Sequence, residues 1–357
     1  MLMLCLVACC SAAPRAAGPS LFFGPTANLT PKPVGANPLA QLVDGLVADE
    51  VQWSGLRAKL DASSGALHLR QMAIGAMNAT QLRALAAATT EAGGGLSLSV
   101  EGGGALCGEG AGAKQAAAAL KEFAPFVAAG GALTHWLLES VYSRTQAGCR
   151  AQSLLDTSAE LAAFAAGISA GGLARANQSL AIFLYDALPH YAVGDAWPPN
   201  APSHYDLELG ATLRALVPAV AARGVALAGY WMDCPYEYSR DYPSASAPLP
   251  AGAGFEKIAA AVKLVKGMGL LVGKTFNSQQ GGQTSAQAFF NGTMADAAGV
   301  AAALPSGVSG GDGLDGMMVE TWYSYPAVAV PETTKYTSAF TALAVFDKLL
   351  PELPGHK

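Results

Sequence analysis

The chain has 357 residues, of which 52% are hydrophobic and 13% are charged, and its formal net charge is −5. This composition supplies a large core, and the lack of a basic stripe or Lys/Arg cluster argues against nucleic acid as a partner. After the N-terminus no run of about 18 apolar residues occurs, so no membrane-spanning helix is expected once a signal segment is removed.

The first residues predict a secretory signal peptide and hence a secreted protein. The apolar segment Met1–Cys10 is followed by the small residues Ser11–Pro14. This order is typical of signal peptides, although no basic residue precedes it. We expect residues 1–18 to be the signal peptide and residues 19–357 to be one domain. The segment Leu6–Cys9 also fits a bacterial lipobox, which would place a lipid on its cysteine.

Asparagine usage favours a glycosylated eukaryotic protein. Four of the seven asparagines lie in N-x-S/T sequons, where random composition would give roughly one. The expected glycosylation sites are Asn28, Asn78, Asn177 and Asn291.

Three cysteines lie beyond the signal segment. Cys107 follows the third expected strand and Cys149 the fourth, so both would lie in adjacent loops. A Cys107–Cys149 disulfide is therefore expected in an oxidising compartment. The alternative is that these two cysteines and Cys234 are unpaired, buried thiols.

Eight apolar segments alternate along the chain with eight segments of helical periodicity. The expected strands are 21–25, 69–76, 96–101, 133–139, 180–186, 225–233, 270–276 and 314–320. The expected helices are 38–60, a segment through Leu82 and Leu85, 116–127, 157–173, 207–220, 255–265, 289–304 and 337–350. Apolar strands that alternate with helices imply parallel strands covered on both faces. Eight such units predict a single (β/α)8 TIM barrel rather than a doubly wound sheet.

Acidic residues end several of these strands, where a (β/α)8 barrel keeps its active site. Because side chains alternate along a strand, Glu101, Glu139, Asp233 and Glu320 are expected to gather at the barrel mouth, with Asp186 as a fifth candidate. Crowded carboxylates raise one another's pKa, which is the condition for a general acid beside an ionised partner.

Tyrosine and tryptophan residues gather in the segments that follow the strands. Aromatic faces stack on sugar rings, and Tyr and Trp also offer a polar edge. The segment Tyr236–Tyr238 is too polar for a core. Together with the acids, this pattern predicts substrate-binding roles for Glu101, Asp186, His190, Tyr191, Trp231, Tyr236, Glu237, Asn277, Trp322 and Tyr323.

With these features the chain resembles secreted TIM-barrel glycoside hydrolases. In the large retaining clan with this fold, the acid/base glutamate ends strand four and the nucleophile ends strand seven. Glu139 matches the first position, whereas strand seven ends at Phe276 without a carboxylate. The resemblance implies hydrolysis of an oligo- or polysaccharide, with Glu139 as general acid. Because the family's nucleophile has no counterpart here, we expect Asp233 on strand six or Glu320 on strand eight to act as the base. A wide separation of these carboxyl groups would imply inversion.

Two other functions remain open. A non-catalytic, carbohydrate-binding barrel would explain the missing acid on strand seven. A metal-dependent hydrolase, or a lyase that acts on acidic polysaccharide, is the second. The lyase would use Tyr236 or His190 as base and Lys274 to neutralise a uronate, although an acid-rich site disfavours an anionic substrate. No cofactor and no metal site are expected, because the five histidines show no paired spacing. His190 and His204 with a carboxylate form the one arrangement that could bind a metal.

Overall fold

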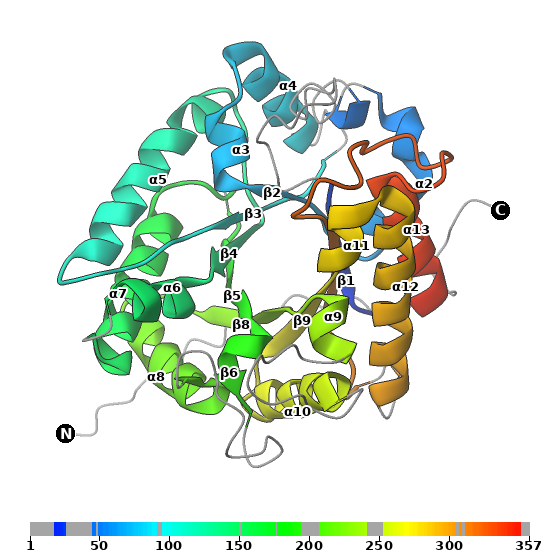
Figure 1. Cartoon of the computed structure of the whole chain (residues 1–357). Helices are drawn as coiled ribbons and strands as arrows, with labels where there is room; N and C mark the ends of the chain where they lie inside the picture. Colours follow the sequence, from blue (N-terminus) through cyan, green and yellow to red (C-terminus); the bar gives the residue numbers. More distant parts are fainter. Residues whose placement is uncertain are drawn as a thin grey trace, which may run out of the picture.

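The computed structural model describes residues 18–25, 45–47, 49–90, 95–149, 152–175, 177–193, 207–240, 253–304, 307–308 and 311–350. Their strands form a closed parallel barrel in the order β1-β10-β9-β8-β5-β4-β3-β2, surrounded by helices (Figure 1). The predicted single TIM barrel is thereby confirmed. The barrel strands are β1 (Ser20–Gly24), β2 (Ala66–Arg70), β3 (Leu98–Gly102), β4 (His135–Glu139), β5 (Ala181–Ala187), β8 (Leu227–Asp233), β9 (Leu271–Phe276) and β10 (Gly316–Glu320).

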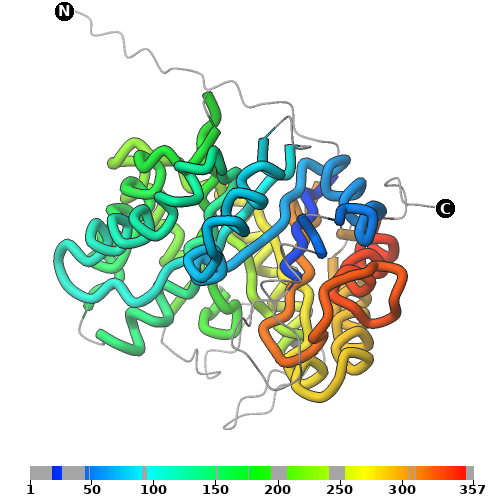
Figure 2. The backbone as a smooth tube through the Cα atoms, turned by 90° about the horizontal axis from the view of Figure 1, so that it is seen from above, coloured from blue at the N-terminus to red at the C-terminus, as the bar shows by residue number. Residues whose placement is uncertain are grey.

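Most of the predicted helices are present, with shifted ends and short additions near the strand ends. The longer helices are α2 (Ser54–Ala62), α4 (Ala79–Thr89), α5 (Ala111–Ala128), α7 (Leu154–Ala170), α8 (Leu209–Ala221), α10 (Ala253–Gly267), α12 (Ala286–Ala303) and α13 (Ser338–Leu349). The shorter elements are η2 (Glu50–Trp53), α3 (Gln71–Gly75), α6 (Val141–Gly148), η3 (Leu188–His190), α9 (Tyr236–Arg240), α11 (Gln279–Thr284) and a small sheet of β6 (Tyr191–Ala192) and β7 (Leu207–Glu208). Although far apart in sequence, α2 and α13 lie side by side and complete the ring of helices (Figure 2).

The second strand differs from its prediction. A strand was expected at 69–76, but β2 covers Ala66–Arg70 and α3 begins at Gln71. The apolar residues at 69, 73 and 74 fit either period, and periodicity alone does not separate a short strand from a short helix. The shift brings His68 into the barrel strand.

The inside of the barrel is filled by a second, smaller core below the mouth. Trp231 is its largest member and lies edge-on to Phe22 and Phe183, at ring-centroid distances of 4.6 and 5.8 Å. Gly273 and Gly316 on the adjacent strands leave room for the indole, since a Cβ at either position would lie 2.5 or 2.6 Å from it. The members of this core are Phe22, Ala66, Leu137, Phe183, Tyr185, Trp231 and Met318.

A disulfide joins Cys107, in the segment after β3, to Cys149 at the end of α6, with a Cα–Cα distance of 5.8 Å. Cys234 is buried and is not in a disulfide. Three sequon asparagines, Asn78, Asn177 and Asn291, are exposed. Asn28 lies outside the described residues, as does the expected signal peptide except for its last residue. Within the described part of the chain, no helix combines the length and apolarity that crossing a membrane requires.

Glu332, in the segment between β10 and α13, caps the first helix of the barrel. Its carboxylate accepts hydrogen bonds from the backbone N–H groups of Gly55 and Leu56, at 2.9 and 2.8 Å. These N–H groups belong to the first turn of α2, where no intrahelical acceptor exists. The cap therefore ties the last part of the chain to the first helix.

Replacing Glu332 by alanine is expected to lower the free energy of unfolding by about 1–2 kcal/mol, because two buried N–H groups lose their acceptor. Urea denaturation would measure this loss. The exposed Glu109 serves as the control, since Glu109→Ala should change stability by less than about 0.5 kcal/mol. Equal stabilities of Glu332→Ala and wild type would show that the cap contributes nothing.

Candidate metal centre at the mouth of the barrel

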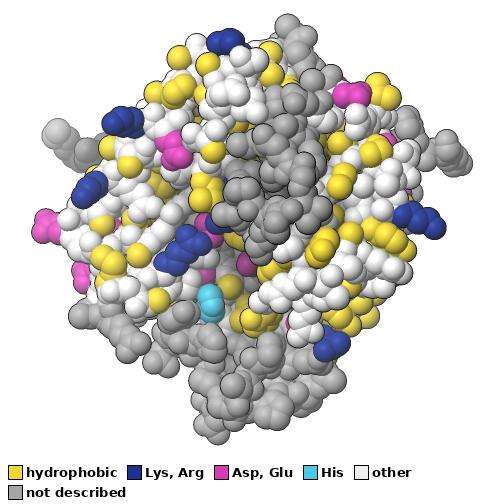
Figure 3. All heavy atoms as spheres, turned by 45° about the horizontal axis from the view of Figure 1, so that its top comes forward, with side chains coloured by type: hydrophobic (Ala, Val, Ile, Leu, Met, Phe, Trp, Pro, Cys, Tyr) yellow, Lys and Arg dark blue, Asp and Glu magenta, His cyan; other side chains and the backbone are white. Residues whose placement is uncertain are grey.

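The carboxyl ends of five barrel strands carry polar side chains that point inward. Alternation along β2 places His68 and Arg70 on one face, and parallel pairing sets Arg70 beside Glu101 of β3. Glu139, Asp233 and Glu320 end β4, β8 and β10. Figure 3 shows acidic, basic and histidine side chains gathered around a hollow on one face of the molecule.

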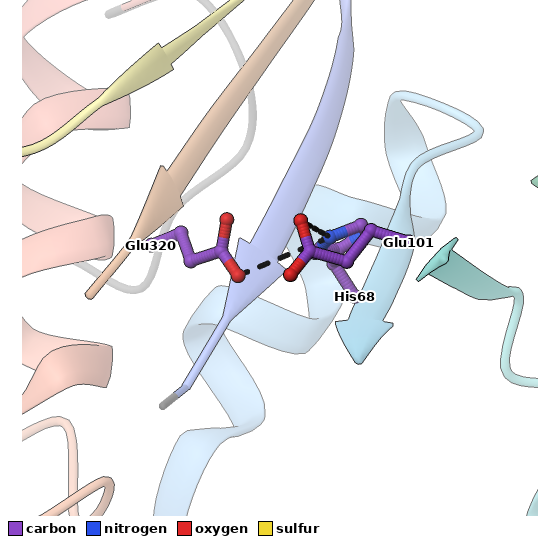
Figure 4. Close-up of side chains that lie close together, drawn as sticks. All are labelled: His68, Glu101 and Glu320. Atoms are coloured by element: carbon purple, nitrogen blue, oxygen red, sulfur yellow. Dashed lines mark ion pairs between the residues drawn. The ribbon is translucent and has the colours of Figure 1, made fainter. Parts of the chain in front are cut away.

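His68, Glu101 and Glu320 form the tightest cluster of this group. Nε2 of His68 lies 3.7 Å from Oε2 of Glu101 and 3.9 Å from Oε1 of Glu320, and Figure 4 shows the three side chains pointing toward one another. One ligand atom from each residue lies within 4.8 Å of the others. A single ion with bonds near 2.1 Å holds its ligand atoms about 3–4.2 Å apart, so the cluster needs only a small contraction to bind one.

The histidine is prepared to act as a ligand. Its Nδ1 lies 2.9 Å from Oγ of Ser99, whereas the buried Nε2 has no hydrogen-bond partner among the described residues. When Nδ1–H donates to Ser99, Nε2 presents its lone pair to the space between the two carboxylates. Burial, together with His135 and Arg70, lowers the pKa of His68 to about 3, which keeps the ring neutral.

Without a cation, the ionised forms of the two glutamates are destabilised by burial and by their mutual repulsion. Burial raises the pKa of Glu101 well above its usual value; Glu320 and Glu139 raise it further, and Arg70 opposes them. Burial likewise raises the pKa of Glu320, with Asp233 and Glu139 adding to the effect and Arg70 opposing it. A divalent cation between the carboxylates would remove this repulsion, since it favours the ionised form of both.

Two arginines lie beside the cluster. Nε of Arg70 is 2.9 Å from Oε1 of Glu101, and its Nη2 is 3.5 Å from Oε2 of Glu139. The ring of Trp322 stacks 4.9 Å from the Arg70 guanidinium. Arg144 on α6 pairs with the other oxygen of Glu139. Glu139 thus lies between two guanidinium groups. Arg70 also orients Glu101 through their ion pair.

Asp233 faces this group from the opposite side of the barrel, because β8 and β2 stand four strands apart in the ring. Burial raises its pKa to about 6; Lys274 and Asn277 oppose this effect, and Glu139 adds to it. A carboxyl group that titrates close to neutrality can both accept and donate a proton. Tyr185 lies between the interior core and the mouth, with its hydroxyl 3.4 Å from Oε2 of Glu320.

The raised pKa of Asp233 predicts a pH-dependent gain in stability when the charge is removed. The pKa of Asp233 is about 6 in the folded protein, against 3.8 for an aspartate in its ordinary state. The ionised carboxylate therefore lowers stability above pH 6, whereas below pH 4 the group is protonated in both states and has no such effect. In EDTA at pH 7.5, Asp233→Asn should be more stable by about 1–2 kcal/mol, allowing for the partial exposure of this residue. Urea denaturation at pH 7.5 and pH 4 measures the difference, and an equal gain at both values would contradict this account.

Four residues expected to bind substrate have structural roles instead. Trp231 is buried in the interior core, below the mouth. Asp186 points away from the barrel interior, since Tyr185 and Ala187 on either side of it point inward. Its carboxylate accepts hydrogen bonds from Ser143 Oγ and Tyr191 OH, at 2.9 and 3.0 Å, which also accounts for the buried Tyr191.

Glu237 is the fourth of these residues. Its carboxylate accepts hydrogen bonds from Ser278 Oγ and from the backbone N–H of Gln279, at 2.6 and 2.8 Å. It therefore caps α11, and the polar segment Tyr236–Tyr238 lies in the short helix α9.

The other expected residues stay near the mouth, and their contact with substrate remains a prediction. Trp322 covers Arg70, and Asn277 lies beside Asp233. Burial raises the pKa of Tyr323, and the nearby carboxylate of Asp233 raises it further. Nδ1 of His190 is 3.5 Å from Asp186. The backbone N–H of Tyr236 donates to the carbonyl of Asn277 at 3.0 Å, and His204 lies outside the described residues.

Sequence reasoning missed three residues of the site. His68 was overlooked because the second strand was expected to start at 69, and Arg70 because it then stood at the beginning of the expected strand rather than at its carboxyl end. The alternation of Ala66, His68 and Arg70 was the signal that would have placed both side chains inside the barrel. Arg144 lies five residues after Glu139, in a segment to which no helix was assigned, and no sequence pattern marked it.

Comparisons with known proteins give matches of fold. No family model and no curated protein matches the chain. The similar solved structures include 2,3-dimethylmalate lyase, a member of the PEP mutase/isocitrate lyase superfamily (TM-score 0.39, 10% identity, 92% of this chain and 90% of that one). They also include a phosphonomutase candidate from Burkholderia cenocepacia (TM-score 0.37, 15% identity, 94% of this chain and 95% of that one). A third is a fructose-1,6-biphosphate aldolase candidate from Coccidioides immitis (TM-score 0.39, 12% identity, 94% of this chain and 90% of that one).

The expected glycoside hydrolase function is corrected by the geometry of the site. Both oxygens of Glu139, the expected general acid, are engaged by Arg70 and Arg144. None of the similar structures named above is called a glycosidase. Glu320 faces His68 and Glu101. Neither a carbohydrate substrate nor a carbohydrate-binding role follows from this arrangement.

Proposed function

We propose that the protein is a metal-dependent enzyme of the lyase type, which binds one divalent cation through His68, Glu101 and Glu320. The observation that carries this proposal is the geometry of three buried ligand atoms within 4.8 Å of one another. The uncommitted Nε2 of His68 supports it. Four carboxyl groups at one barrel mouth are hard to reconcile with a role in folding alone, because their mutual repulsion costs stability.

The chemistry of the ligands narrows the choice of metal. One imidazole and two carboxylates suit Mn²⁺, Fe²⁺, Co²⁺ or Zn²⁺, whereas Mg²⁺ and Ca²⁺ prefer oxygen alone. A bound cation of this kind supplies Lewis acidity that stabilises negative charge on a substrate oxygen. Arg70 keeps Glu101 in its ligating orientation through the 2.9 Å ion pair.

Asp233 is the residue that moves a proton in this proposal. It faces the cluster across the barrel, is partly exposed, and has a pKa near neutrality. Breaking a bond next to a carbonyl group requires a proton acceptor or donor on one side and charge stabilisation on the other. This division of roles favours a lyase over a glycosidase, since it requires no pair of carboxylates flanking a glycosidic oxygen.

The test is a reaction screen with and without metal. EDTA-treated protein is reloaded with Mn²⁺ or Zn²⁺ and incubated with a panel of small hydroxy acids, and proton NMR identifies the products. We expect cleavage only with metal, and a loss of about a hundredfold or more in Asp233→Asn at unchanged metal content. Activity that persists in EDTA, or release of hydrolysis products alone, would refute the lyase proposal.

We also propose that the protein enters the secretory pathway. The Cys107–Cys149 disulfide and the exposed sequon asparagines Asn78, Asn177 and Asn291 support this proposal. Expression in eukaryotic cells should yield a medium fraction whose mass falls on treatment with a peptide N-glycanase. An intracellular product of unmodified mass would contradict export.

A further inference from the structure

A cavity of about 200 Å³ opens beside the proposed metal site. Two guanidinium groups from different elements line it, Arg70 at the end of β2 and Arg144 on α6. A cavity of this volume suits a small molecule. Glu101 lines the cavity and also belongs to the metal cluster.

Both arginines keep hydrogen-bond donors that Glu139 and Glu101 do not use. Arg70 engages carboxylates with Nε and Nη2, and Arg144 engages Glu139 with Nη2. A guanidinium carries five N–H donors. Among the described residues, Nη1 of both arginines and Nε of Arg144 have no acceptor. These donors suit an oxyanion, because a guanidinium binds carboxylate or phosphate oxygens in pairs.

The charge of the cavity depends on the metal. Its lining combines two guanidinium groups with the carboxyl groups of Glu101, Glu122 and Glu139, so it attracts no anion before a cation binds. A divalent cation on Glu101 and Glu320 offsets the charges of both carboxylates, so the excess negative charge around the two guanidinium groups is removed. Metal binding should therefore favour the binding of an anion in the same place.

We propose that the substrate is a small acid whose anionic group binds between Arg70 and Arg144, and that this group binds only after the metal ion. The inference rests on the proposed function, and it names the substrate class of the same site. Glu139 acts as a specificity-determining residue, because it competes with the substrate's anionic group for the two guanidinium groups. The acid-rich sequence pattern alone pointed the other way.

Isothermal titration tests this inference with malonate, phosphate and the neutral malonamide, each added to Mn²⁺-loaded and to EDTA-treated protein. Malonate or phosphate should bind the loaded protein about tenfold or more tightly than the EDTA-treated one, and malonamide should not bind. Whichever of the two anions binds more tightly identifies the substrate's anionic group as a carboxylate or a phosphate. The variants are Arg144→Gln and Glu139→Gln, with Arg214→Gln as the control, since Arg214 is an exposed arginine that pairs with Glu208 at 3.2 Å.

The two site variants should act in opposite directions. Arg144→Gln should weaken anion binding by about tenfold, because charge-assisted hydrogen bonds are lost. Glu139→Gln should strengthen it, and Arg214→Gln should match wild type. An anion affinity unchanged in Arg144→Gln would show that the metal alone holds the anion and would overturn the inference. If the protein takes up the cation but the cation does not strengthen anion binding, this inference is overturned and the proposed function stands. If the protein takes up no cation, both the inference and the proposed function are overturned.

Discussion

Replacing Glu320 by glutamine is expected to abolish metal binding and, at the same time, to make the metal-free protein more stable. The metal affinity should fall by about a hundredfold or more, because removing a ligand exceeds the effect of disturbing its supporting partners. The metal-free gain arises because burial raises the pKa of Glu320, so its ionised form costs stability at neutral pH. The gain should grow as pH rises above the unfolded value of this glutamate and vanish below it.

Thermal unfolding with increasing Mn²⁺ measures both effects. Wild type should gain about 2.7 kcal/mol at a metal concentration one hundred times its dissociation constant, whereas Glu320→Gln should start higher and gain nothing. Glu122→Gln is the matched control, since Glu122 lines the neighbouring cavity but is not in the metal cluster. A Glu320→Gln variant that is still stabilised by metal would remove this glutamate from the ligand set.

Replacing Trp231 by alanine is expected to cost about 3–5 kcal/mol of stability, the range observed when a large buried aromatic side chain is truncated. Trp231 is 1% exposed and fills the barrel interior between Phe22 and Phe183. Gly273 and Gly316, which lie against the indole, have no side chain that could fill the vacated space. Its Nε1–H also donates to Thr275 Oγ1 at 3.1 Å, and this acceptor would lose its donor.

Urea denaturation of Trp231→Ala and of Trp322→Ala separates a core role from a role in the site. Trp322 lies over Arg70 at the mouth rather than in the interior core, so Trp322→Ala should cost less than about half as much. Equal losses in the two variants, or a Trp231→Ala protein as stable as wild type, would contradict the placement of Trp231 in the core.

The fold could be predicted because the strands and helices of this chain differ in the period of their apolar residues. The nearly continuous apolar strands 133–139 and 225–233 and the helical segments after them left little choice of architecture. Element ends were harder to predict. At Leu69, Ala73 and Ile74 the apolar positions fit both periods, and only the contacts of β2 with its neighbours decide that the strand ends at Arg70.

The positions of the acidic residues in the candidate site could be predicted from the sequence, but their partners and function could not. Glu101, Glu139, Asp233 and Glu320 were placed at the mouth because strand ends and alternation fix where they point. Their function was misread because sequence spacing cannot show what stands between two carboxylates. The partners that change the interpretation, His68, Arg70 and Arg144, come from β2 and α6, and their closeness to the glutamates arises only when the barrel closes.

The same limit explains the aromatic residues. Trp231 and Tyr191 follow the pattern of a sugar-binding loop in sequence, yet one fills the barrel and the other hydrogen-bonds to Asp186 on the outer face. Position after a strand predicts proximity to the mouth. It does not predict which face of the strand a side chain occupies when the end of the strand is uncertain by one residue.

The most direct test of the account is the metal content of the purified protein at equilibrium. Wild type is dialysed against Mn²⁺ or Zn²⁺ and analysed for metal and protein, in parallel with His68→Ala. We expect one tightly held ion per chain in wild type and a loss of that ion in His68→Ala, at unchanged circular dichroism. A folded wild-type protein that retains no ion, or a His68→Ala variant that retains it fully, would contradict a metal site at His68, Glu101 and Glu320.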